Sequence, residues 1–241
     1  MGKEITEQLI NLWRRSFFIE PFVILFFTFC FIVGLLLHNK NKERLFFTGY
    51  FLSGVMLFVP TTIIVVGNIL ANKQLTIYQE IANTFFEISE FLAFYFFFKK
   101  CLKKTVFQKY LKVCLYVLLT SISIFLIGLA LPGYKAEDIK VHSLFVNAIE
   151  FFFLFVMCLA YFRELFTDPP TKHLFSRPSF LIVACTFFYT ILMIPFFLIA
   201  NDIFLSETAI YNIFFACHYV LLMILLFSIL RGFLYKTAIT T

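Results

Sequence analysis

Residues 76–100 read TIYQEIANTFFEISEFLAFYFFFKK, an apolar segment that nevertheless contains three carboxylates. The segment is long enough to cross a bilayer, because about 20 apolar residues span the hydrocarbon core as a helix. Its polar residues Glu80, Asn83, Glu87 and Glu90 are spaced three, four and three apart, which places them on one face of a helix. Ionisable groups are costly inside a membrane and mark a site or a pathway there. The segment therefore predicts a membrane helix with a functional polar face.

The composition of the whole chain is typical of a membrane protein. Of 241 residues, 61% are hydrophobic, 38 are Phe and 14% are charged, whereas about 25% charged residues is usual in a soluble domain. The mean hydropathy is +0.92. The apolar residues form seven blocks, each about long enough for one span, and none alternates like a barrel strand. The blocks are 17–38, 45–67, 76–98, 110–131, 141–162, 178–200 and 209–231. We therefore predict an all-α polytopic integral membrane protein, a seven-transmembrane-helix bundle.

The predicted bundle leaves little chain outside the membrane. We assign residues 1–16 to an interfacial amphipathic segment with Trp13 at the headgroups, 17–234 to the transmembrane domain and 235–241 to a short cytoplasmic tail. The second span contains Gly49, Gly54, Pro60 and Gly67. Small residues let helices approach closely in membranes, so these positions indicate close helix packing.

The basic residues predict the orientation of the bundle. The formal net charge is +6, and 14 of the 20 Lys and Arg residues fall on one side of the predicted topology. The positive-inside rule then places the N-terminus outside and the C-terminus in the cytoplasm, although Arg14 and Arg15 lie on the opposite side. The densest basic cluster follows the third span and consists of Lys99, Lys100, Lys103 and Lys104. We interpret it as an anchor to anionic lipid, with a docking patch for an acidic partner as the alternative. Membrane topology explains the basic residues, so nucleic-acid binding is not supported.

A second polar face occurs in the fifth predicted span, where Asn147 and Glu150 lie one turn apart. In the seventh span, Tyr211 and His218 are seven residues apart on one face. Glu150 and His218 fall in the middle third of their spans, as Glu87 and Glu90 do, whereas Glu80 lies closer to the surface. We therefore predict an intramembrane ligand or proton site near the midplane. Its candidate residues are Glu87, Glu90, Asn83, Asn147, Glu150, Tyr211 and His218.

The chemistry of this predicted site has several alternatives, because no Lys or Arg lies at the same depth. The carboxyl groups are protonated, are solvated in a water-filled pocket, or hold a cation or metal together with His218. A plainer interpretation is that they form hydrogen bonds with neighbouring helices and only hold the bundle together. A catalytic metal centre is the least favoured, because no H-x-x-x-H or E-x-x-H pair is present. We expect no catalytic residues and no cofactor. A retinal Schiff base is excluded, since residues 209–231 contain no Lys.

Two segments resemble a known family. Residues 166–201 read FTDPPTKHLFSRPSFLIVACTFFYTILMIPFFLIAN, and residues 209–235 read AIYNIFFACHYVLLMILLFSILRGFLY. They resemble uncharacterised seven-helix membrane proteins of Bacteroidota that are often encoded beside two-component histidine kinases. The matching features are the proline loop before Pro178 together with Tyr189, Pro195, Asn201 and Asn212. One departure is Ser179-Phe180, where the family has Phe-Trp. The resemblance implies a bacterial inner-membrane location and a kinase partner, but no established activity.

These observations together favour a receptor-like sensory or signalling membrane protein. Its intramembrane polar pocket would sense a stimulus, and its basic cytoplasmic loops would contact a histidine kinase or another signalling protein. A proton-coupled small-molecule transporter is the alternative, because intramembrane carboxylates also serve as proton relays. A membrane-embedded metal enzyme is a third and less favoured interpretation. We expect the protein to be multi-pass in the bacterial inner (cytoplasmic) membrane.

Overall fold

The fold is helical throughout the part of the chain that the structure, a computed structural model, describes. That part comprises residues 20–37, 45–57, 74–130, 136–167, 174, 177–206 and 208–234, and no strand occurs within it. Seven α-helices are found there. They are α2 (Glu20–Leu37), the Leu45–Leu57 helix, α4 (Gln74–Cys101), α5 (Thr105–Ala130), α6 (Ala136–Thr167), α7 (Pro178–Ser206) and α8 (Thr208–Leu234). The predicted N-terminal segment 1–16 and tail 235–241 lie outside the described residues.

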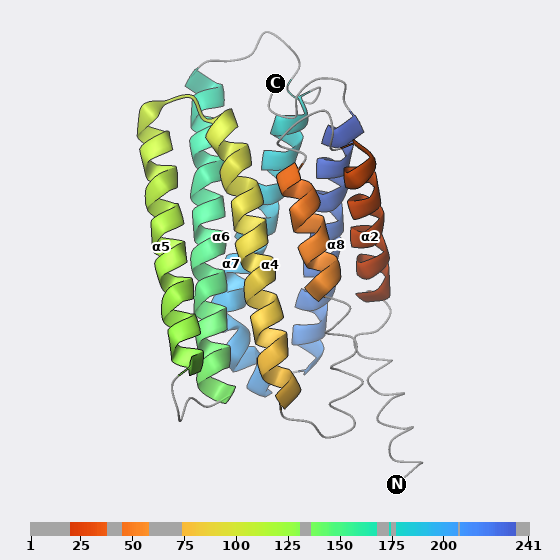
Figure 1. Cartoon of the computed structure of the whole chain (residues 1–241), viewed down its shortest axis with the longest axis vertical. Helices are drawn as coiled ribbons and strands as arrows, with labels where there is room; N and C mark the ends of the chain where they lie inside the picture. Colours follow the sequence, from red (N-terminus) through yellow and green to blue (C-terminus); the bar gives the residue numbers. More distant parts are fainter. Residues whose placement is uncertain are drawn as a thin grey trace.

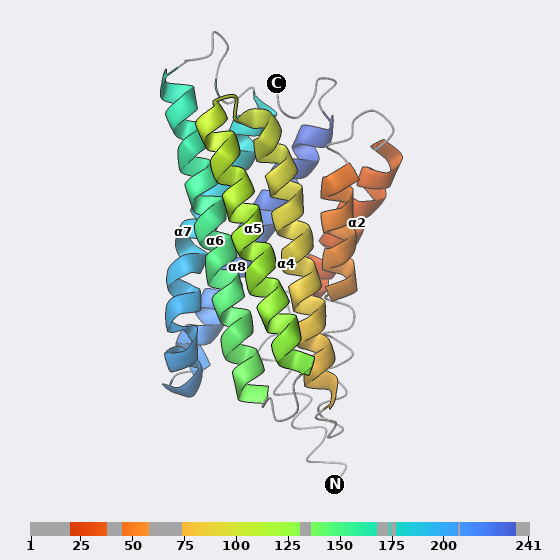
Figure 2. The ribbon, with the colours of Figure 1, turned by 60° about the vertical axis from the view of Figure 1, so that its left-hand side comes forward.

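The helices form one elongated bundle with their axes running along its length (Figure 1). Helix α7 packs between α6 and α8, while α6 also packs against α4 and α5, and α2 packs against α8. Helices α5 and α2 stand at opposite edges of the bundle in Figure 1, and in the turned view α5 comes to the front while α2 stays at the right-hand edge (Figure 2). Helices α4 and α6 are therefore neighbours in the interior, where side chains from both can meet.

Four of the described helices contain segments long and apolar enough to cross a membrane. These segments are Thr105–Gly128, Phe145–Thr167, Pro178–Pro195 and Ala216–Leu234. Phe22–Leu37 and Leu45–Leu57 are apolar but shorter. Helix α4 is not among the four; its described part contains Glu87 and Glu90 and ends in Lys99 and Lys100. The all-helical fold is thus confirmed for the described residues, and the four apolar segments support the predicted membrane character, while the count of seven spans stays a prediction.

Helices α4, α5, α6, α7 and α8 are longer than the apolar blocks that predicted them. Helix α5 begins at Thr105 instead of residue 110, and α6 extends from Ala136 to Thr167 instead of from 141 to 162. Apolarity reports only the length in contact with hydrocarbon, and polar residues continue a helix beyond it. Helix α7 also continues through Pro195 to Ser206, since neighbouring groups can compensate for the missing hydrogen bond in a membrane helix.

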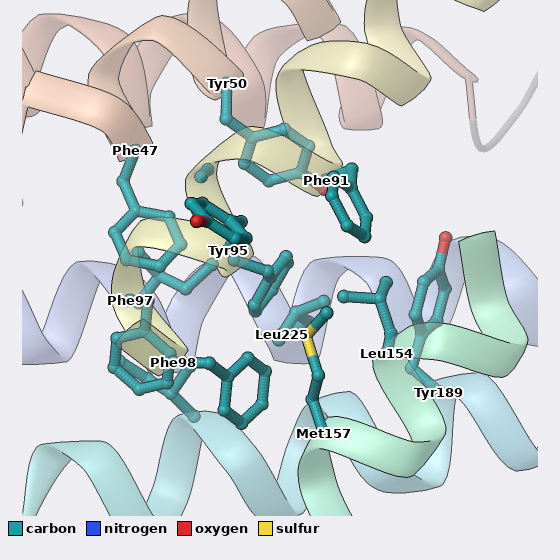
Figure 3. Close-up of a cluster of buried hydrophobic side chains, with 14 of the residues drawn as sticks. Phe47, Tyr50, Phe91, Tyr95, Phe97, Phe98, Leu154, Met157, Tyr189 and Leu225 are labelled. Carbon is teal, nitrogen blue, oxygen red and sulfur yellow. The ribbon is translucent and has the colours of Figure 1, made fainter. Parts of the chain in front are cut away.

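Aromatic rings fill much of the core around the Leu45–Leu57 helix and α4 (Figure 3). Phe47 and Phe94 meet edge-to-face with ring centroids 5.6 Å apart, and Phe46 stacks on Phe96 at 3.9 Å. Edge-to-face pairs are favoured because the positive ring edge meets the negative face of its neighbour. The many Phe residues of the sequence therefore form a packed interior in addition to covering the surface.

Two glycines allow α2 and the Leu45–Leu57 helix to approach closely. A Cβ atom on Gly34 would lie 2.6 Å from Oγ1 of Thr48, and one on Gly54 would overlap the ring of Phe27. A Cβ atom on Gly49 would meet nothing within 4 Å. Close packing is therefore confirmed at Gly54 but was a wrong interpretation of Gly49, which faces open space. Pro60 and Gly67 lie outside the described residues.

Candidate functional site

Three carboxylates lie together in the interior of the bundle. Glu87 and Glu90 are near the middle of α4, and Glu150 is near the middle of α6. Their exposed fractions are 6%, 2% and 1%. Glu150 is close enough to both α4 residues for like-charge repulsion to act on it. We call these three residues the carboxylate cluster. The structure places these predicted residues side by side, and their functional role stays a prediction.

Tyr50 joins the cluster from a third helix. Its hydroxyl donates a hydrogen bond to Oε1 of Glu90 over 3.3 Å, and its ring is completely buried. Its ring also contacts two rings of α4, Phe86 with centroids 5.4 Å apart and Phe94 with centroids 6.3 Å apart. Sequence reasoning missed Tyr50, because it is 40 residues from Glu90 and its own span shows no polar face.

Glu150 has an unusual environment for a carboxyl group. Both of its oxygens are buried, and neither has a hydrogen-bond partner among the described residues. Burying a charge without a partner is far more costly than burying a polar group that is hydrogen-bonded. The carboxylate cluster must therefore be neutralised by protons or a bound cation, or be solvated by water. Glu150 is the member with both oxygens available to such a species.

Tyr189 of α7 links the carboxylate cluster to His218 of α8. The phenol is close enough to Glu90 and Glu150 to interact with them electrostatically, and its ring stacks on the imidazole with centroids 5.5 Å apart. Nδ1 of His218 lies 3.1 Å from Sδ of Met193. His218 therefore reaches the cluster through Tyr189, and groups from five helices meet around one centre.

The remaining predicted site residues are placed less fully. Asn147 is half-buried on α6, one turn before Glu150. Asn83 belongs to α4 and Tyr211 to α8, but their side chains lie outside the described part, as does that of Glu80. Over the ranges with described side chains, no group of three or more His, Cys, Asp or Glu is arranged to hold a metal ion. The metal-enzyme interpretation therefore receives no support from this geometry.

The turn between α4 and α5 forms the basic end of the bundle. The Glu164 carboxylate accepts hydrogen bonds from the backbone N–H of Lys103 at 3.0 Å and of Lys104 at 2.8 Å. Nε2 of Gln108 donates to the carbonyl oxygen of Lys99 at 2.7 Å and to that of Leu102. These bonds satisfy backbone groups that the two helix ends would otherwise leave unpaired. Sequence reasoning missed both Glu164 and Gln108, because exposed polar residues at a helix end show no distinguishing pattern.

Every Lys and Arg with a described side chain lies at this end of the bundle. These residues are Lys99, Lys100, Lys103, Lys104, Lys109, Lys112, Arg163, Arg177 and Arg231. The four side chains of the predicted basic cluster are all exposed. Glu164 is the one described carboxylate at the same end. The described part of the bundle thus has a strongly basic end and acidic groups in its centre.

Fold and site together define the class: a helical membrane protein with carboxylates buried at the centre of its bundle. Comparisons of the chain with protein-family models, with curated proteins and with solved structures found no match.

Proposed function

We propose that this protein is a receptor-like signalling protein of seven transmembrane helices, controlled at the carboxylate cluster. The observation that carries the proposal is Glu150, whose two buried oxygens have no hydrogen-bond partner among the described residues although two further carboxylates lie beside it. Such a group binds a proton or a cationic or hydrogen-bonding ligand strongly, because binding removes an uncompensated buried charge. The cluster is therefore a suitable place for a stimulus to act.

The arrangement of the helices provides a route from the cluster to the basic end. Helix α6 carries Glu150 in its middle and Glu164 near its end, where Glu164 holds the α4–α5 turn. Helix α4 carries Glu87 and Glu90 and leads directly into the same turn. A change in repulsion between α4 and α6 therefore alters the position of this turn. A stimulus acts by favouring one of two such arrangements through its differential affinity for them.

The partner in this proposal is a histidine kinase or another cytoplasmic signalling protein. The N-terminus lies outside and the C-terminus inside the bacterial inner membrane, which brings the basic end to the cytoplasm. The one-sided distribution of the described Lys and Arg residues supports this orientation. The resemblance of residues 166–201 and 209–235 to proteins encoded beside histidine kinases supports the choice of partner.

Complementation of a deletion strain tests the proposal. Deletion changes the transcriptome, and the wild-type chain restores it, whereas a double variant Glu90→Gln and Glu150→Gln inserts in equal amount but does not restore it. Ser89→Ala is the matched control, because among the described residues this hydroxyl donates within its own helix, to the carbonyl oxygen of Phe85. An unchanged transcriptome on deletion, or full restoration by the double variant, contradicts the proposal.

Proton-coupled transport of a small molecule is the second candidate. It is favoured by the grouping of Tyr50 and Tyr189 around Glu90 and Glu150, because phenols and carboxyls can pass a proton between them. Proteoliposomes that contain a pH-sensitive dye and receive a panel of amino acids and organic acids test it. Transport predicts an internal pH change that Glu150→Gln abolishes, and a pH change that persists in this variant contradicts it.

A further inference from the structure

A groove on the outer surface of the bundle runs between α5 and α6 at the basic end. Its volume is about 560 Å³. Two cations, Lys109 and Arg163, line it together with an apolar wall and one phenol, and no carboxylate is among its lining residues. The other lining residues are Val106, Phe107, Tyr110, Val113, Val156, Leu159 and Ala160. This composition, cations at one end of an apolar surface, is independent of the carboxylate cluster.

The position of the groove along the helices defines its surroundings in a membrane. Both helices contain segments long and apolar enough to span, Thr105–Gly128 and Phe145–Thr167. Lys109 lies near the start of the first segment and Arg163 near the end of the second, so both cations are at the same membrane boundary. Long basic side chains at such positions extend their charges to the headgroup level. The apolar wall then faces the acyl chains.

One of the two charges at the groove is held by an aromatic ring, and no carboxylate is among the lining residues. The guanidinium of Arg163 lies over the ring of Phe107, 5.9 Å from its centroid, a favourable cation–π position. The adjacent carboxylate, Glu164, is engaged by the backbone N–H groups of Lys103 and Lys104. The positive charge of Lys109 and Arg163 is therefore available to an anion.

We propose that this groove is a specific binding site for an anionic phospholipid of the leaflet at the basic end. The phosphate lies between Lys109 and Arg163, and one acyl chain follows the wall formed by Val113, Val156 and Leu159. Tyr110 lies at the depth where amphipathic rings favour the interface. The choice of a lipid over a soluble anion follows from the apolar wall, which is 56% exposed at Val113 and 43% at Leu159 and needs an apolar occupant.

Native mass spectrometry of the delipidated full chain in detergent tests the site. The probes are dioleoyl phosphatidylglycerol and dioleoyl phosphatidylcholine, which share acyl chains and differ in net charge. We expect phosphatidylglycerol to bind about tenfold more tightly, and the double variant Lys109→Gln and Arg163→Gln to lose about tenfold in affinity for it. Lys112→Gln with Arg231→Gln removes the same charge from exposed positions at the same end that do not line the groove, and we expect its affinity to stay within about twofold of wild type.

A second variant tests the apolar wall separately. Val113→Trp fills the groove while keeping both cations, and its exposed position tolerates a larger side chain. We expect it to bind phosphatidylglycerol as weakly as the charge variant does. Equal losses in the two charge variants mean that diffuse basic charge alone attracts lipid. That result overturns the proposal. Equal affinities of the wild-type chain for the two lipids, or wild-type binding by Val113→Trp, would also overturn it.

Discussion

At the scale of single residues, the candidate site depends on how each buried carboxyl group is surrounded. Glu90 accepts a hydrogen bond from Tyr50, whereas the Glu150 oxygens have no hydrogen-bond partner among the described residues. These two carboxyls are chemically identical but have different surroundings. Glu90 is held by its neighbour, whereas the buried oxygens of Glu150 can bind a species that reaches the centre of the bundle. This difference makes Glu150 the residue at which we expect a stimulus to act.

The hydrogen bond between Tyr50 and Glu90 predicts a stability effect. Tyr50→Phe removes the donor and leaves a buried carboxyl oxygen without it, which we expect to cost about 1–2 kcal/mol in unfolding free energy. Tyr116→Phe is the control, because Tyr116 is 66% exposed. Denaturant unfolding in detergent micelles measures both. Equal stability of the two variants would show that the 3.3 Å contact contributes nothing.

At the scale of helices, the ends of α4, α5 and α6 are joined by one carboxylate. Glu164 bonds two backbone N–H groups at the start of α5, where the helix dipole also favours negative charge. We expect Glu164→Gln to destabilise the protein by about 1 kcal/mol, since the amide has one acceptor oxygen and no charge. Lys103→Gln keeps the backbone N–H and should leave the melting temperature unchanged. Equal melting temperatures of the two variants would contradict a stabilising role for the bonds from Glu164 to the backbone.

Helix packing around the two contrasting glycines gives a second prediction at this scale. Gly54→Ala forces a methyl group against the fully buried ring of Phe27, and we expect a loss of about 1–3 kcal/mol from overpacking. Gly49→Ala, on the same helix, meets open space and should be neutral or stabilising by up to about 1 kcal/mol. Thermal unfolding of the two variants measures the difference. Equal destabilisation of both would contradict the close approach at Gly54.

Local spacing predicted part of the site and could not predict the rest. The three- and four-residue spacing of Glu87 and Glu90 identified the polar face of α4, because helix geometry alone determines which residues share a face. It does not determine which helix lies opposite that face. Tyr50 and Tyr189 were therefore missed as site residues, since their roles arise only when distant helices pack. The helix ends were misplaced for a related reason, because contacts such as that of Glu164 with the α4–α5 turn continue helices past their apolar blocks.

At the scale of the whole molecule, the basic and the acidic groups occupy different positions along the bundle. The described cations lie at one end, and the carboxylate cluster lies in the interior. This separation is the pattern expected of a membrane protein whose basic end faces the cytoplasm.

Reporter fusions test that orientation. Alkaline phosphatase fused after Cys101, at the basic end, should be inactive, because it remains in the cytoplasm. The same reporter fused after Ala130, at the opposite end of α5, should be active. The converse pattern would reverse the topology and place the proposed partner on the wrong side.

The coupling between the carboxylate cluster and the basic end is tested most directly by a distance measurement. Spin labels at Lys99→Cys and Phe166→Cys, both exposed, report on the ends of α4 and α6 in a chain whose accessible native cysteines are replaced. Glu90→Gln with Glu150→Gln removes the charges from the cluster. We expect the distance distribution from pulsed electron spin resonance to shift by about 2 Å or more. Superimposable distributions with and without the carboxylates would contradict control of the basic end by the carboxylate cluster.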